Sequence, residues 1–279
     1  MIQLEQVAKL KVSAASGCVI VNDAVHVVAD DDVSLHVYGL DGSGRGSLRL
    51  LPDEMPSDEK DRKKRKPDFE ALTALPGGRL LSIGSGSTPA RERAIEVSAW
   101  GPGWGERTRI IDAGPLFTRL RSEFSELNIE GCAVHDGALW LAQRGNGAKR
   151  ENGLIRLKLD ASMLLSRSSV VGISRITLGE LDGVPLSITD LSAGPGGVLH
   201  FSAAAEDTDD PYLDGECMGS VIGAFEFVDG QARVAWTRKL DQVVKIEGLA
   251  WHRDDQFFLV ADADDPTVQA PLFRARLKK

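Results

Sequence analysis

The stretch NIEGCAVHDGALWLAQRG, residues 128–145, has the form that decides the fold. An acidic residue is followed by a short apolar run, a turn at Asp136-Gly137 and a second apolar run, a pattern typical of paired β-strands. Counted from the acidic residue Glu130, three other segments repeat this pattern from residues 70, 190 and 247, and a fifth, with a serine in place of the acidic residue, begins at residue 16. The five copies are spaced by 54, 60, 60 and 57 residues. A near-constant period of this size is typical of a repeat architecture.

Each copy continues with further strand-like segments, so the sequence predicts an all-β, five-bladed β-propeller with four antiparallel strands per blade. Radial repetition of this kind protects the edges of the sheets. A single domain, residues 1–279, is expected. Residues 6–12 are expected to join the last blade and close the ring, and a short helix is expected near residues 115–125. The expected blades are 13–52, 68–112, 128–178, 187–240 and 245–279.

The composition indicates a soluble globular protein without a nucleic-acid partner. The chain of 279 residues is 42% hydrophobic and has a net charge of −8, which disfavours binding to nucleic acid or to anionic membranes. The first residues, MIQLEQVAKLKVSAAS, lack the continuous apolar core of a signal peptide. Three cysteines without close spacing indicate reduced thiols. We therefore expect a cytoplasmic monomer with no membrane partner.

The first residues of the five copies are the candidate metal ligands. In a propeller the first strand of each blade lines the central channel, so these residues should form a ring near one mouth. The ring residues are Ser16, Glu70, Glu130, Asp190 and Glu247. Four carboxylates this close would repel one another. Ca²⁺, which takes about 6–8 oxygen ligands, would resolve the conflict. The ring contains no His or Cys, which disfavours zinc or copper.

Two alternatives to a metal remain open for this acidic ring. Arginine or lysine side chains, such as Arg144 and Lys66, would neutralise the acids by pairing with them. The carboxylates would also be satisfied by backbone N–H groups of the next blade. In both cases the ring serves the structure rather than a cofactor.

The ends of the second strands predict a pocket above this ring. One residue from each blade stands at this position, and the five form a second ring: Asp30, Ser85, Arg144, Ala204 and Asp262. The loops at residues 84–93 and 143–152 are basic, whereas those at 205–216 and 261–266 are acidic. This mixture suits a small anionic or polar ligand. The candidate pocket residues are Asp30, Lys66, Ser85, Arg91, Arg93, Arg144, Glu206 and Asp262.

Short motifs in the repeats resemble a known family. The IEG elements at 129–131 and 246–248, with DFEAL at 68–72 and ITDLSAGPGG at 188–197, resemble a bacterial family of uncharacterised β-propellers related to the esterase-like domain of phytase. The acidic ring is also similar, more distantly, to that of the calcium-dependent soluble apyrases and of the gluconolactonase/senescence-marker propellers.

These resemblances imply metal-dependent hydrolysis of an ester, lactone or phosphoanhydride. Glu130 or Glu247 would then be a general base, and Arg144 would hold an anionic group. The sequence has no Gly-x-Ser-x-Gly element, so a Ser-His-Asp triad is not indicated. The alternative is a non-catalytic propeller that binds a small ligand or a protein and whose acidic ring is structural.

Overall fold

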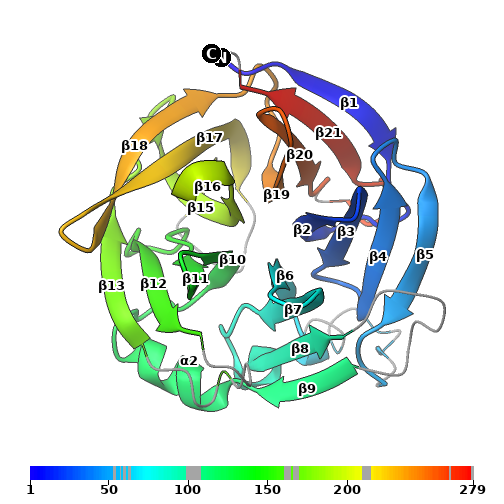
Figure 1. Ribbon diagram of the computed structural model, residues 1–279, viewed down its shortest axis with the longest axis horizontal. Coiled ribbons are helices and arrows are strands. Elements are labelled where there is room, and N and C mark those ends of the chain that lie inside the picture. Colours follow the sequence, from blue (N-terminus) through cyan, green and yellow to red (C-terminus); the bar gives the residue numbers. More distant parts are fainter. Residues whose placement is uncertain are drawn as a thin grey trace.

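The computed structural model describes residues 1–52, 55–56, 58, 61, 64–98, 108–159, 165, 170–208, 215–263 and 265–277. Five antiparallel β-sheets stand in a ring around a central axis (Figure 1). The predicted all-β, five-bladed β-propeller is therefore confirmed. In the described part of the chain, no helix has the length and apolar character needed to cross a membrane.

The five blades follow one another along the chain. Blade 1 consists of β2 (Ala15–Val21), β3 (Ala24–Ala29), β4 (Ser34–Gly39) and β5 (Gly44–Arg49). Blade 2 consists of β6 (Phe69–Leu75), β7 (Arg79–Gly84), β8 (Arg93–Val97) and β9 (Thr108–Asp112). Blade 3 consists of β10 (Ile129–His135), β11 (Ala138–Gln143), β12 (Asn152–Lys158) and β13 (Val170–Ile176).

Blades 4 and 5 depart from a simple run of four strands. Blade 4 consists of β15 (Val184–Ala193), β16 (Leu199–Asp207), β17 (Glu216–Val228) and β18 (Gln231–Lys239), and the short β14 (Glu180–Leu181) pairs with the start of β15. Blade 5 consists of β19 (Ile246–His252), β20 (Gln256–Ala261), β21 (Pro271–Arg276) and β1 (Leu4–Lys9). The N-terminal strand β1 lies outside β21, with Leu4 opposite Ala275, and closes the ring as expected (Figure 1).

The hydrophobic core is divided into five clusters, one between each pair of neighbouring blades. The helix α2 (Gly114–Arg121), expected near residues 115–125, adds Leu116, Phe117 and Leu120 to the cluster between blades 2 and 3. Because each face of a blade packs on a neighbour, the strands need apolar side chains on both faces, which is why β11 is buried along its whole length.

Each innermost strand contains a β-bulge at the same point. The register with the second strand shifts by one residue in all five blades. The additional residue lies outside the normal alternation, and a bulge re-aims its side chain. The five bulge residues are Ser16, Glu70, Glu130, Thr189 and Glu247.

The bulges correct one member of the expected ring. In blade 4 the additional residue is Thr189, and Asp190 is the next residue, paired with Ser202. Asp190 therefore occupies the place of Gly131 in blade 3 and Gly248 in blade 5. The sequence comparison aligned the acidic residues of the repeats, whereas the backbone aligns the bulges.

Candidate functional site

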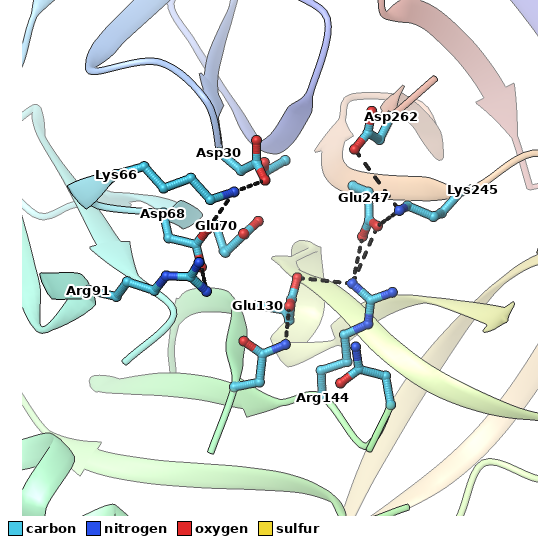
Figure 2. A pocket seen from close by; sticks show the side chains of 13 residues that line it. Asp30, Lys66, Asp68, Glu70, Arg91, Glu130, Arg144, Lys245, Glu247 and Asp262 are labelled. Atoms are coloured by element: carbon cyan, nitrogen blue, oxygen red, sulfur yellow. Dashed lines mark hydrogen bonds and ion pairs between the residues drawn. The ribbon is translucent and has the colours of Figure 1, made fainter. Parts of the chain in front are cut away.

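A polar cavity of about 130 Å³ lies on the propeller axis, at the mouth where the five bulges lie (Figure 2). Four of the five predicted ring residues line it. The full lining is Ser16, Asp30, Lys66, Asp68, Glu70, Arg91, Asn128, Glu130, Arg144, Asn146, Lys245, Glu247 and Asp262. The lining thus contains six carboxyl groups and four basic side chains, so the acidic groups outnumber the basic ones.

Three backbone positions of the repeat supply most of this lining. The first is the bulge residue, and the second is the residue that follows the second strand, as in Asp30, Arg144 and Asp262. The third lies two residues before the bulge and provides Asp68, Asn128 and Lys245. Sequence reasoning found the first two positions and missed the third, although the same repeat alignment marks it. It also missed Asn146.

Blades 1 and 2 contribute a cluster of three carboxylates. Each carboxylate places one oxygen within 4.8 Å of an oxygen of the other two, and the three residues are Asp30, Asp68 and Glu70. The ammonium group of Lys66 contacts the Asp30 carboxylate and lies 2.9 Å from Oδ1 of Asp68. The cluster therefore already contains one positive group, as Figure 2 shows.

Asp68 has a dense set of partners. Arg91 places a guanidinium nitrogen 2.8 Å from Oδ2 of Asp68, and the buried Ser85 hydroxyl donates a hydrogen bond of 2.6 Å to the same oxygen. Ser85, expected in the pocket, therefore lies behind Asp68 and supports it rather than lining the cavity. Arg93, also expected there, is an exposed residue at the start of β8 and does not line the cavity.

Glu70 differs from its neighbours because its carboxylate forms no hydrogen bond or ion pair with any residue that the structure describes. Burial raises the pKa of Glu70 well above its usual value, and the negative charges of Glu130, Asp68 and Asp30 raise it further, against the opposing effect of Lys66. A carboxylate in this position is stabilised by protonation or by a cation.

Arg144 joins the acids of blades 3, 4 and 5. Its guanidinium lies 3.3 Å from Oε2 of Glu130 and 3.3 Å from Oε1 of Glu247, and it contacts Glu206. Lys245 lies 3.4 Å from both Glu206 and Glu247. Glu206, expected in the pocket, is buried behind the cavity wall. Each of the three glutamates on this side thus has at least one basic partner.

Glu130 has a pKa suited to proton transfer. Burial raises the pKa of Glu130 to about 7, although Arg144 lowers it, and the charge of Glu247 contributes to the increase. The side-chain amide of Asn128 donates a hydrogen bond of 2.6 Å to its Oε1. A carboxyl group that titrates near neutral pH is suited to general acid–base chemistry.

Asp190 has a structural role away from the cavity lining. Its carboxylate accepts hydrogen bonds from the backbone N–H groups of Leu191, at 2.7 Å, and of Leu249 in blade 5, at 2.8 Å. Burial raises the pKa of Asp190 well above its usual value. This is the backbone hydrogen bonding considered as an alternative to a metal. The Ser16 hydroxyl likewise donates to a backbone oxygen, that of Ala14, at 3.2 Å.

The cluster of Asp30, Asp68 and Glu70 fits a hard divalent cation. Ca²⁺–oxygen distances are about 2.3–2.6 Å, so ligand oxygens on opposite sides of the ion lie up to about 5 Å apart. The separation of at most 4.8 Å within the cluster is compatible with this geometry. Of the predicted acidic loops, residues 209–214 and 264 lie outside the described residues.

Solved structures with similar folds include β-propeller enzymes. A glutaminyl cyclase from Myxococcus xanthus is 14% identical, with 99% of this chain and 97% of that chain covered and a TM-score of 0.58. A luciferin-regenerating enzyme is 12% identical, with coverages of 99% and 96% and a TM-score of 0.51. At these identities the likeness shows the fold alone.

No curated protein matches the chain in sequence. The expected relation to the phytase-associated domain stays a prediction. A family model, described as a family of unknown function (DUF6929), matches residues 11–277. The match spans nearly the whole propeller, from just before blade 1 to the end of blade 5, and the chain belongs to this family.

Proposed function

We propose that the axial cavity binds Ca²⁺ through Asp30, Asp68 and Glu70. The observation that carries this proposal is the Glu70 carboxylate, which lies beside two other carboxylates and forms no hydrogen bond or ion pair with the residues that the structure describes. Carboxylate oxygens are preferred Ca²⁺ ligands. No histidine or cysteine lines the cavity among the described residues, which disfavours zinc or copper. A bound cation would balance the negative charge that the four basic groups leave.

The reaction that we propose for this site is hydrolysis of a small ester, lactone or phosphoanhydride. The cation would polarise the scissile group when bound. Glu130, with a pKa of about 7, would accept the proton of the attacking water. Arg144 and Lys245 would attract an anionic substrate, and Glu247 would hold both in place.

The size of the cavity limits the substrate. At about 130 Å³ it is smaller than the roughly 300–1,000 Å³ typical of sites that enclose a drug-sized ligand. Only the reacting group would enter, and the rest of a small polar or anionic substrate would lie outside the mouth.

We also propose that the protein is a cytoplasmic monomer and that it has no nucleic-acid or membrane partner.

Calorimetric titration of chelator-treated protein with Ca²⁺ tests the cation site. We expect binding to the natural chain and an affinity at least about tenfold lower for Glu70→Gln, which removes a charged ligand. Glu96→Gln is the matched control, because Glu96 is a buried acid paired with Arg79 and Arg109 outside the cavity. Equal affinities of the two variants, or no binding at millimolar Ca²⁺, would reject the site.

A second candidate function is a binding module with a structural acidic ring. It is favoured by Lys66, whose ammonium group already lies among the acidic cluster, and by Arg144, which pairs with three glutamates. The Glu130→Gln and Glu247→Gln variants separate the two functions. Hydrolysis of ester, lactone and nucleotide panels should fall in both variants if the site is catalytic. Activity unchanged in both folded variants favours the binding module.

A further inference from the structure

A second cavity lies at the opposite end of the blades from the axial site. It has a volume of about 410 Å³, within the typical range for small-molecule pockets. Glu130 stands near the start of β10 and His135 at its end, so the two cavities lie at opposite ends of this strand. The wall also includes Gly230 of the turn between β17 and β18, which places the cavity between blades 3 and 4.

Three aromatic rings form one wall of this cavity. The ring centroids of Trp140 and Phe227 are 4.8 Å apart, and those of His135 and Phe227 are 5.5 Å apart with an interplanar angle of 21°. Burial lowers the pKa of His135, so its imidazole is neutral near pH 7. The wall therefore offers flat, uncharged ring surfaces.

Arg156 brings a positive charge to this wall. It lies opposite Trp140 in the pairing of β11 with β12, and its guanidinium carbon is 5.7 Å from the Trp140 ring centroid. Its Nε atom is buried without a hydrogen-bond acceptor, and Arg156 forms no ion pair with any described residue. A buried donor of this kind favours a ligand that supplies the missing acceptor.

A second arginine shows that stacking alone does not leave the charge unpaired. Arg175 lies over the ring of Phe124 at 4.0 Å, but its guanidinium is also 3.5 Å from a carboxylate oxygen of Glu151. The arrangement at Arg156 thus combines the same ring contact with a missing anion.

We propose that this cavity binds a small aromatic monocarboxylate. The ring of the ligand would pack on the aromatic wall, and its carboxylate would pair with the planar donors of Arg156. Asp136, which is exposed and also lines the cavity, repels a second negative charge and so favours a monoanion.

Calorimetric titration of the full chain with benzoate tests the ligand class. Benzamide, which has the same shape without the charge, and cyclohexanecarboxylate, which has the charge without the aromatic ring, are the comparison ligands. We expect benzoate to bind at least about fivefold more tightly than either. Equal binding of benzoate and benzamide, or no benzoate binding up to about 10 mM, would overturn the proposal.

Substitutions identify the cavity. Arg156→Gln should weaken benzoate binding about tenfold, and Arg156→Lys, which keeps the charge but loses the planar donors, should weaken it less. Arg175→Gln and Glu70→Gln should leave it unchanged, and the second of these separates this site from the axial one. Thermal unfolding shows whether each variant is folded. If Arg156→Gln is not folded, the benzoate affinity of Arg156→Lys is used for the test. Benzoate affinity unchanged in the folded Arg156 variant would overturn the assignment.

Discussion

The two sides of the axial cavity are built on the same backbone positions and differ in how their charges are neutralised. On the side of blades 3, 4 and 5, three glutamates share Arg144 and Lys245. On the side of blades 1 and 2, Lys66 and Arg91 pair with Asp30 and Asp68, while Glu70 lacks an ion pair among the described residues. The propeller thus supplies equivalent positions, and the side chains decide whether a charge is satisfied internally or left for a ligand.

Removal of Arg144 should have the largest effect on the stability of the protein. Arg144→Met removes the guanidinium group that pairs with three buried glutamates, and we expect a loss of about 3–5 kcal/mol in the free energy of unfolding at pH 7. The loss should be smaller at pH 5, where Glu130, with a pKa of about 7, is protonated and needs no counter-charge. Urea unfolding at both pH values measures it. Equal losses at the two pH values would assign the effect to packing instead of charge.

The pKa of Glu130 should make stability depend on pH. Its folded-state pKa of about 7 lies above its usual value of 4.5, so its contribution is present in full below about pH 4.5 and is lost as the pH rises through 7. In the presence of chelator, we expect the ionisation of this group to lower the free energy of unfolding by about 1–3 kcal/mol as the pH rises from 5 to 8. Glu130→Gln should flatten the profile by that amount in urea unfolding. Parallel profiles of the two proteins would contradict the prediction.

Lys66 should compete with a cation on the side of blades 1 and 2. Lys66→Gln removes the ammonium group from Asp30 and Asp68, and we expect the Ca²⁺ affinity to rise about tenfold in calorimetric titration. Lys245→Gln is the matched control, because Lys245 pairs with acids on the other side of the cavity. An equal rise in both variants would indicate the overall charge of the cavity rather than local competition.

Ser16 should have the smallest effect. Its hydroxyl donates to the backbone oxygen of Ala14, so Ser16→Ala should change the free energy of unfolding by less than about 0.5 kcal/mol and the Ca²⁺ affinity by less than about threefold. Urea unfolding and calorimetric titration measure the two quantities. A tenfold loss of affinity would instead indicate that Ser16 is a ligand of the cation. The cation site on the side of blades 1 and 2 would then include Ser16.

The fold was predictable because its signals are local and repeated. The constant period gave the blades, and two-residue turns such as Asp136-Gly137, both of which have positive φ, marked the hairpins. Closure by the N-terminal strand followed from the missing strand of the last repeat, and the pairing of β1 with β21 confirms it.

The site was predictable only in part because bulges and ion pairs are not local signals. Thr189 carries no charge, so the acidic Asp190 next to it was assigned to the ring in its place. The neutralising partner of Glu130 depends on where Arg144 lies relative to Glu206 and Glu247, which come from blades 4 and 5. The sequence left open whether a cation or basic side chains neutralise the ring, and the structure shows basic side chains at all the acids of this side.

The pairing of β1 with β21 has a consequence for how the chain folds as it is synthesised. Leu4 lies in the first strand of the propeller to be synthesised, and its partner Ala275 lies in the last strand of the propeller. Blades 1 to 4 can form from neighbouring segments, whereas blade 5 has to wait until both strands are present. During that interval β1 has no partner strand, and an unpaired strand of this kind is open to pairing with another chain.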